Sequence, residues 1–461
     1  HSQYQRDTQG AFHVRTAQQL SRQDNRQGHL TQHAMQWAYG GLRMGGRSYY
    51  ALDLSQFSAQ QPHRIQLQFH IDPERESVHH AQGSTHYPQL RHMGQSWSKP
   101  TVGYVYWQGK RRLVMAVGGG YDTGYEQSNY HQTNQQGAGI YLFDAMTGEL
   151  LWWASANHRQ STSADVIAAT DGDVHHLKYS VVSPIQAIDS NQDGVWDRLY
   201  FADLAGQAFR VQLSQSHQAQ RPFTAMVQRI LNEYRADGLS PRFYHAPSVS
   251  AHSNAQGQFL AVAWSSGDYS SLWAKSPVTA HDGVYVLHEP LAKGAISQND
   301  TQALMPLQQL SEQNQSSSRG WFYRYASVAG EIKGIASPYV RQNRLYIPVY
   351  RQATASCEPT LGQSELLQLC MPWGVCGGLN ATTLPALLPQ QVQRITLGQG
   401  IWPLQWAMAT HEQRLSISQQ NGKNANAEFC KTPAGLGHAA CLQLQPMAQL
   451  RILKWSQANG L

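Results

Sequence analysis

Long apolar runs and concentrated charge are both missing from this sequence of 461 residues. No stretch of 18 apolar residues occurs, so no membrane-spanning helix is expected in this chain. Only 14% of the residues are charged, and the net charge of +6 is not gathered into any run of five Lys or Arg. A diffuse excess of this size is typical of a solvated surface, so nucleic acid is not an expected partner.

The short motifs that mark common enzymes are also missing. There is no G-x-S-x-G nucleophile turn and no glycine-rich phosphate loop. The dipeptide His411-Glu412 lacks the second histidine of a zinc-protease helix. The pairs His79-His80 and His175-His176 offer metal-ligand chemistry, but polar loop histidines are the simpler interpretation. We therefore expect that the protein is not an enzyme.

Cysteine is confined to the last third of the chain. The five cysteines are Cys357, Cys370, Cys376, Cys430 and Cys441. No C-x-x-C spacing occurs among them, which argues against a zinc knuckle. Their clustering predicts local disulfides formed in an oxidising compartment. Cys430 with Cys441 is the first pairing to expect, because it closes a Gly- and Pro-rich segment, and a second bridge is expected within the remaining three.

The sequence is rich in short β-branched and aromatic runs separated by glycine turns. Residues 139–153 predict two strands joined by a turn that ends in glycine. The same Tyr-x-x-Asp pattern recurs at 48–53 and 198–203, and in weaker form at 284–287. Single predicted strands also begin after Ser-x-Pro or Lys-Pro. Repeated units of about four strands favour a β-propeller over a β-sandwich, the alternative all-β fold.

One segment departs from the β pattern. Residues 223–235 place apolar side chains at helical spacing, with Pro222 before them and Gly238 after them. We therefore predict an amphipathic helix at 223–235, inserted between blades. Residues 1–461 are expected to form a single propeller-like domain, with a cysteine-containing closing region at 351–461. The weakly periodic stretches 61–96, 291–318 and 377–426 are predicted to be long inter-blade loops.

Residues 189–197 carry the one constellation with defined chemistry, Asp-Ser-Asn-Gln-Asp-Gly-Val-Trp-Asp. In an EF-hand-like loop, oxygen ligands come from alternate positions, a glycine makes a sharp turn at position 6 and position 7 offers its carbonyl. The corresponding residues here are Asp189, Asn191, Asp193, Gly194, Val195 and Asp197. Carboxylates this close together repel one another unless a cation neutralises them. The loop therefore predicts a calcium site.

This loop departs from an EF-hand in two ways. Position 12 is Tyr200 in place of the bidentate glutamate, and the flanking segments are predicted strands. Asp197 would therefore close the site directly, which suits Ca²⁺ because it accepts six to eight oxygens in flexible geometry. The alternative is an acidic hairpin tip that uses Asp and Asn only to form turns.

The order of these pieces resembles the C-terminal domain of the PilY/PilC family of type IV pilus tip-associated proteins. The matching segments, in chain order, are residues 45–53, 94–100, 118–122, 139–153, 189–203, 206–210, 242–247 and 337–338. The resemblance implies a modified seven-bladed propeller with one calcium ion in the loop. The ligands it implies are the side chains of Asp189, Asn191, Asp193 and Asp197 and the carbonyl of Val195.

The same resemblance implies a cell-surface adhesin at the pilus tip. Such a protein promotes pilus assembly and opposes retraction, and so affects twitching motility and host-cell attachment. The implied partners are minor pilins of the tip complex and a host-cell receptor or glycan. An Arg-Gly-Asp route to integrins is not expected, because Arg319-Gly320 is followed by Trp321.

Three other functions compete with this one. The Tyr-x-x-Asp hairpins resemble those of quinone-cofactor dehydrogenase propellers, but the adjacent cysteines typical of those enzymes are missing. A glycan-binding propeller could stack sugars on Trp152-Trp153 or on the tyrosines of 121–130. A purely structural scaffold could dock minor pilins at an open sheet edge.

Overall fold

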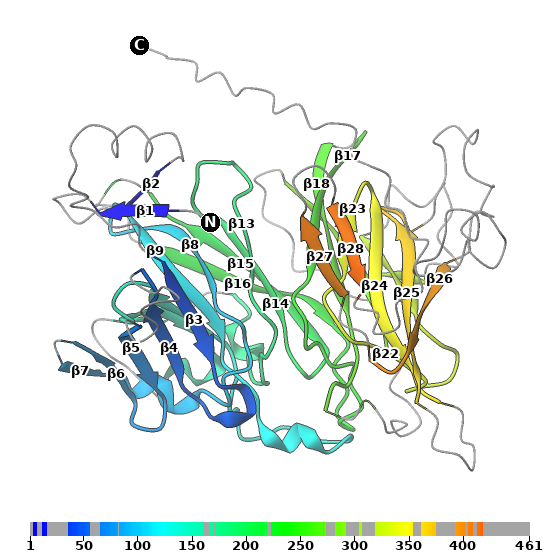
Figure 1. Ribbon diagram of the computed structural model, residues 1–461, viewed down its shortest axis with the longest axis horizontal. Helices are drawn as coiled ribbons and strands as arrows, with labels where there is room; N and C mark the ends of the chain where they lie inside the picture. The colour runs from blue at the N-terminus through cyan, green and yellow to red at the C-terminus, as the bar shows by residue number, and fades with distance from the viewer. Residues whose placement is uncertain are drawn as a thin grey trace.

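The computed structural model is built almost entirely from antiparallel sheets (Figure 1). It describes residues 3–6, 12–15, 36–55, 65–81, 83–159, 166–168, 172–216, 218, 223–255, 257–270, 272, 282–291, 304–306, 319–353, 361–374, 392–401, 404–408 and 413–417. Within these residues the only helical segments are short 3₁₀ turns. They are η1 (Arg43–Gly45), η2 (Pro88–His92), η3 (Thr123–Glu126), η4 (Ala156–Arg159) and η5 (Val174–His176).

Five large sheets follow one another along the chain, and most of their strands pair with the strand that precedes or follows them in sequence. The first sheet contains β3 (Trp37–Gly41), β4 (Tyr49–Asp53), β5 (Gln66–Asp72), β6 (Ser77–His80) and β7 (Gly83–His86). The second contains β8 (Thr101–Trp107), β9 (Lys110–Gly118), β10 (Ile140–Asp144), β11 (Leu150–Ala154) and β12 (Ile167–Ala168). The third contains β13 (Gln186–Ile188), β14 (Arg198–Ala202), β15 (Gln207–Ser214) and β16 (Thr224–Asn232).

The remaining sheets lie on the opposite side of the molecule from the first (Figure 1). The fourth sheet contains β17 (Ser248–Asn254), β18 (Gly257–Ser265), β19 (Gly283–Pro290), β20 (Met305–Pro306) and β21 (Gly320–Arg324). The fifth contains β22 (Ile332–Gly334), β23 (Tyr339–Arg341), β24 (Arg344–Arg351), β25 (Gln363–Cys370) and β26 (Gln393–Gln399). Two small ribbons pair β1 (Gln3–Arg6) with β2 (Phe12–Arg15) and β27 (Leu404–Met408) with β28 (Gln413–Ile417).

Apolar clusters fill the space between successive sheets. One cluster joins the first sheet to the second, and the next joins the second to the third. Strand β10 contributes to both, because Tyr141 and Phe143 belong to one cluster and Leu142 to the other. Two further clusters lie between the third and fourth sheets and between the fourth and fifth. Side chains that alternate between two buried faces explain why these strands are apolar throughout.

The recurring motifs have direct structural causes. Asp144 ends β10, and its Oδ1 accepts hydrogen bonds from the amides of Met146 (2.7 Å) and Thr147 (2.9 Å). Asp203 caps the hairpin after β14 in the same manner, accepting from the amide of Ala205 at 2.9 Å. The aspartate of Tyr-x-x-Asp therefore closes the turn into the next strand.

Prolines stand just before the first strand of three sheets and before the second strand of the fifth. Pro100, Pro184, Pro247 and Pro338 stand just before β8, β13, β17 and β23. A proline cannot donate to a ladder and keeps its preceding residue extended, so it is well suited to begin a strand. The predicted Ser-x-Pro or Lys-Pro entry is confirmed at β8, which follows Ser98-Lys99-Pro100. The other three prolines follow Ser183, Ala246 and Ser337 directly and do not match that motif.

The predicted helix at 223–235 is wrong. Thr224–Asn232 form β16, which pairs with β15 along its length. Phe223, Val227 and Leu231 are spaced by four residues, a spacing that places side chains on one face of a helix or of a regular strand. Buried Ala225 and exposed Met226 distinguish the two, since they alternate as in a strand. The open edge of β15 offers hydrogen bonds to the whole segment, and this outweighs its local helical preference.

The stretch 61–96, predicted to be a loop, is also corrected, since it contains β5, β6, β7 and η2. Most of 291–318 and 377–426 lies outside the described residues, but their described parts contain β20 in the first and β26, β27 and β28 in the second, so the loop prediction is wrong there as well. Cys357, Cys376, Cys430 and Cys441 also lie outside the described residues, whereas Cys370 ends β25. The disulfide pairings and the extent of the closing region at 351–461 therefore stay predictions.

Gly118, at the end of β9, permits the second sheet to approach the third. A Cβ atom at this position would lie 2.3 Å from the carbonyl oxygen of Val181, in the segment that leads into β13. We predict that Gly118→Ala lowers the free energy of unfolding by about 1–3 kcal/mol, because backbone atoms must move apart. Gly40→Ala is the matched control, since a Cβ there meets nothing within 4 Å. Urea unfolding curves with equal midpoints for both variants would contradict this interpretation.

Candidate metal centre

The loop at residues 189–197 lies at the tip of the β13–β14 hairpin. Ile188 pairs with Arg198, and the Asp197 amide donates to the carbonyl of Ile188 at 2.9 Å. The predicted position of the loop between two strands is thus confirmed. The hairpin belongs to the third sheet, so the acidic tip extends from a paired framework.

Contacts with the second sheet fix one side of this loop. The Trp196 amide donates to the carbonyl of Tyr104 at 2.8 Å, and its indole lies so close to Gly103 that a Cβ there would be 2.4 Å from the ring. Val195 is buried in the apolar cluster between the first and second sheets. Arg111 donates to the carbonyl of Gly194 at 3.0 Å. The loop therefore bridges two sheets.

Side-chain oxygens turn toward the backbone of the loop tip. Asp189 accepts from the amides of Asp193 (3.2 Å) and Gly194 (2.8 Å). Asn191 accepts from the Asp193 amide at 3.1 Å, and Asp193 accepts from the Val195 amide at 3.0 Å. Gly194 has a φ of +86°, the left-handed conformation expected of glycine at the sharp turn. The chain thus winds around its own oxygen-bearing side chains.

Asp197 has one satisfied oxygen and one unsatisfied oxygen. Its Oδ2 accepts from the amide of Ser190 at 3.0 Å and from the Ser190 hydroxyl at 2.5 Å. Its Oδ1 is buried and has no hydrogen-bond partner. A buried carboxylate oxygen without a partner is costly, and a cation would satisfy it. This orphaned oxygen, among hard oxygen donors, is the feature of the loop that fits calcium.

The loop is less tightly gathered than a completed coordination sphere. Among the described residues, two clusters bring three His or Asp ligand atoms within 4.8 Å of one another. Neither cluster includes a residue of this loop. The three carboxylates of the loop therefore need side-chain rotation to meet at one ion. The ligand set Asp189, Asn191, Asp193, Val195 and Asp197 stays a prediction. Sequence reasoning missed Ser190, whose hydroxyl orients Asp197, because position 2 of an EF-hand loop supplies no ligand.

A second candidate site is a cavity of about 460 Å³ where the entry segments of several sheets converge. Its walls come from β3 and from the residues before β8, β13 and β17. The lining residues are Tyr39, Gly40, Gly41, Arg43, Ser96, Trp97, Ser98, Lys99, Pro100, Val182, Pro184, Tyr244, His245 and Tyr269. They include four aromatic rings and two basic side chains, but no carboxylate. Sequence reasoning did not find this site, although two of the prolines that precede strands, Pro100 and Pro184, belong to its lining.

Arg43 and Trp97 organise the mouth of this cavity. The Arg43 guanidinium lies 4.5 Å from the centroid of the Trp97 ring, which in turn stacks on Tyr121 at 4.8 Å. Burial, with the nearby charge of Arg43, lowers the pKa of His245 to about 4. His245 is therefore neutral near pH 7, and the positive charge of the cavity comes from Arg43 and Lys99.

Four of the aromatics predicted to stack on sugars are in the core instead, whereas Tyr130 is half-buried. Trp152 and Trp153 are 1% and 0% exposed, and Tyr121 and Tyr125 are also buried. The two tryptophans belong to apolar clusters on opposite faces of β11. This part of the glycan hypothesis is wrong, because aromatic residues in a strand buried on both faces serve packing.

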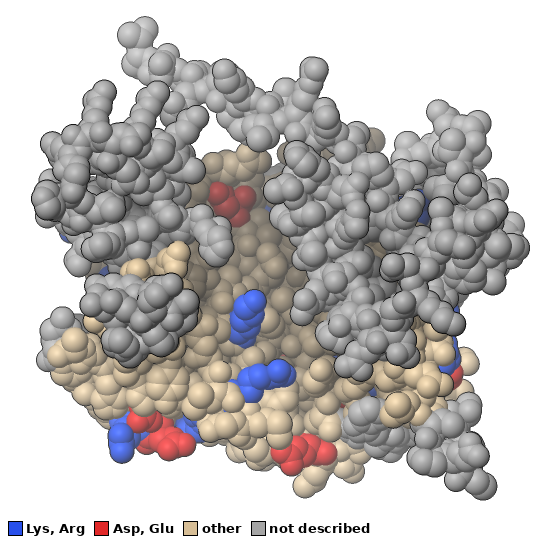
Figure 2. All heavy atoms as spheres, in the orientation of Figure 1, with Lys and Arg blue, Asp and Glu red and all other residues tan. Residues whose placement is uncertain are grey.

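Charges are scattered over the face in Figure 2, where isolated Lys, Arg, Asp and Glu interrupt a mostly uncharged surface. This agrees with the diffuse charge expected from the sequence. Among the described residues no helix has the length and hydropathy needed to cross a membrane.

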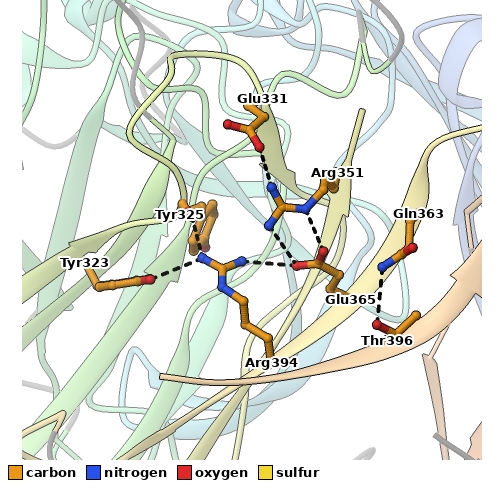
Figure 3. A network of polar contacts seen from close by, with 8 residues as sticks. All are labelled: Tyr323, Tyr325, Glu331, Arg351, Gln363, Glu365, Arg394 and Thr396. Atoms are coloured by element: carbon orange, nitrogen blue, oxygen red, sulfur yellow. Dashed lines mark hydrogen bonds and ion pairs between the residues drawn. The ribbon is translucent and has the colours of Figure 1, made fainter. Parts of the chain in front are cut away.

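A polar network between the fourth and fifth sheets is structural in character (Figure 3). Glu365 forms ion pairs with Arg351 at 2.7 Å and with Arg394 at 3.1 Å. Arg351 also forms an ion pair with Glu331. Arg394 also donates to the carbonyl of Tyr325, beyond β21, at 2.6 Å. Two arginines and two glutamates neutralise one another here. The network therefore ties β26 to the fourth sheet and leaves little net charge for a ligand.

Successive antiparallel sheets, packed face to face through apolar clusters, define this protein as a β-propeller, as predicted. The chain belongs to the PilY1 beta-propeller domain family, whose model matches residues 3–318. The protein is therefore associated with the type IV pilus, and the resemblance seen in the sequence is confirmed. The number of blades stays a prediction.

Comparison with solved structures agrees with this assignment. The crystal structure of the Pseudomonas aeruginosa PilY1 C-terminal domain is similar to this chain, with a TM-score of 0.56. The match covers 89% of this chain and 88% of that chain at 14% sequence identity, so it bears on the fold alone. No curated protein matches the chain.

Proposed function

We propose that the protein is a calcium-binding adhesin of the type IV pilus tip that also acts in pilus assembly and retraction. Membership of the PilY1 family supports the association with the pilus. The buried, unpartnered Oδ1 of Asp197 is the single observation that carries the calcium assignment. The proposal places the protein on the cell surface, where minor pilins and a host receptor or glycan are its partners.

The loop residues have separate roles in this proposal. Asp189, Asn191 and Asp193 present oxygens from the tip, and Val195 adds its carbonyl while its buried side chain anchors the loop. Asp197 closes the site, held by Ser190. Bound calcium supplies positive charge that offsets the repulsion among three carboxylates. Because Trp196 and Arg111 tie the loop to the second sheet, occupancy would stiffen the contact between two sheets.

We predict that Asp197→Ala abolishes the calcium-dependent rise in melting temperature. Binding to the folded state alone stabilises it by about 2.7 kcal/mol at a hundredfold excess over Kd, so the wild-type protein should melt a few degrees higher in calcium than in chelator. Differential scanning fluorimetry measures the shift, and calorimetric titration measures the binding.

The matched control is Asp237→Ala, which removes an exposed carboxylate paired with Arg235 outside the loop. This variant should keep the full response to calcium. A wild-type melting curve that does not change with chelator, together with no heat of binding, would show that the loop is only an acidic turn.

The cavity near Arg43 supports a second element of the proposal, recognition of an acidic sugar. Its volume of about 460 Å³ lies in the range of small-ligand sites. Aromatic faces suit the apolar face of a sugar ring, and Arg43 and Lys99 suit a carboxylate or sulfate group. The lack of any carboxylate among the lining residues favours an anionic ligand over a neutral one.

We predict that Arg43→Glu combined with Lys99→Glu abolishes binding to acidic glycans on an array. The reversed charge repels the anionic group, whereas Lys110→Glu, at the exposed start of β9, should leave binding unchanged. Because His245 is already neutral, binding should not strengthen as the pH falls from about 8 to 5. Equal binding by both variants would place glycan recognition elsewhere.

A further inference from the structure

A group of metal-ligand side chains lies in the first sheet, far along the chain from the calcium loop. It contains His70 and Asp72 on β5 and His79 on β6. One ligand atom from each residue lies within 4.8 Å of the other two. The hairpin that carries them is on the side of the molecule away from the fourth and fifth sheets (Figure 1).

The register of the sheet brings these residues together. His70 is directly opposite His79 in the β5–β6 pair, and Asp72 is two residues from His70 on the same strand. Residues at this spacing share a face. The intervening Ile71 and its partner Val78 belong to the apolar cluster shared with the second sheet. The three polar residues therefore occupy the face turned away from that cluster.

The interatomic distances are close to those of a coordination site. His79 Nε2 lies 3.8 Å from Asp72 Oδ2. In a tetrahedral zinc site with bonds of about 2.0–2.1 Å, neighbouring ligand atoms are separated by roughly 3.4 Å. A small side-chain rotation is therefore enough to place all three ligand atoms around one ion.

Two ring nitrogens in this group are buried without hydrogen-bond partners. They are Nε2 of His70 and Nε2 of His79. Leaving such atoms unsatisfied costs free energy, and two of them on facing rings beside a carboxylate point to a shared ligand. A simple His79–Asp72 ion pair would still leave His70 Nε2 without a partner.

Neighbouring groups orient each ligand. His79 Nδ1 lies 2.6 Å from the Ser84 hydroxyl, so that Nε2 can carry the lone pair. Asp72 Oδ1 accepts from the amides of Glu74 and Arg75, which leaves Oδ2 to face His79. The Tyr50 ring stacks on His70 with a centroid distance of 4.5 Å.

The arginine that pairs with Asp72 is exposed. Arg75 Nη1 lies 3.7 Å from Asp72 Oδ2, but its side chain is 77% exposed and can move into solvent. Two imidazoles and one carboxylate suit Zn²⁺, whereas Ca²⁺ and Mg²⁺ prefer oxygen ligands alone. We propose that His70, Asp72 and His79 form a zinc-binding site whose fourth position is open to water or an external ligand.

The test is calorimetric titration of the whole, metal-free chain with Zn²⁺. One high-affinity zinc should bind to the wild-type protein, and His79→Ala should abolish this event. Ser84→Ala, which removes only the orienting hydroxyl, should weaken binding roughly 10–100-fold. Co²⁺ in place of Zn²⁺ should give tetrahedral visible absorption that is lost in His79→Ala.

His80→Ala is the matched control. His80 follows His79 on β6 but pairs with Phe69, a residue of the core cluster, and so lies on the other face. This variant should bind zinc as the wild-type protein does. Asp197→Ala should also bind zinc normally, and His79→Ala should keep its response to calcium, so the two metal proposals fail independently.

Equal zinc affinity in the wild-type and His79→Ala proteins would overturn the proposal, provided that circular dichroism shows both to be folded. Loss of zinc binding in a His175→Ala/His176→Ala variant instead would overturn it too. That result would assign the ion to the group formed by those histidines and Asp173.

Discussion

Face-to-face packing of successive sheets is the constraint on which the remaining structure depends. Each inner sheet is buried on both faces, so its strands must be apolar at consecutive positions, as in the run Tyr141-Leu142-Phe143. Polar groups that cross between sheets must then be satisfied in the interior. Glu289 of the fourth sheet accepts from the Tyr200 hydroxyl at 2.6 Å and pairs with Arg210 at 3.3 Å, both on the third sheet. Such buried, paired groups fix the relative position of two sheets as well as their separation.

The same packing determines where recognition can occur. Strand residues between two sheets are buried in the apolar clusters. Binding sites can therefore form only at hairpin tips, at the segments before strands and on faces turned away from a neighbouring sheet. The acidic loop is a hairpin tip, and the cavity near Trp97 is built from entry segments. The group formed by His70, Asp72 and His79 lies on a sheet face turned away from the neighbouring sheet. Only the cavity joins segments that are distant in sequence, whereas the His70 group depends on the pairing of β5 with β6.

Local signals in the sequence predicted the parts of the fold that local interactions determine. The aspartate turns, the proline entries and the position of the loop at 189–197 depend on residues within a few positions of one another. The β16 segment was predicted wrongly, because its helical preference is local and its strand partner is not. The role of Trp152 and Trp153 was also mispredicted, since their burial depends on sheets that pack from both sides. His70 and His79 were not linked, because the pairing of β5 with β6 brings them together and 61–96 was taken to be a loop.

The placement of Trp196 has a mechanical consequence. The residue belongs to the hairpin of the third sheet, yet its backbone amide bonds to β8 and its indole fills the space beside Gly103. Separating the second and third sheets requires withdrawal of this ring from beside Gly103 and loss of the Trp196–Tyr104 hydrogen bond. The contact between the two sheets is therefore reinforced by a residue of the acidic loop itself. This contact gains resistance to separation at this point without any additional covalent link.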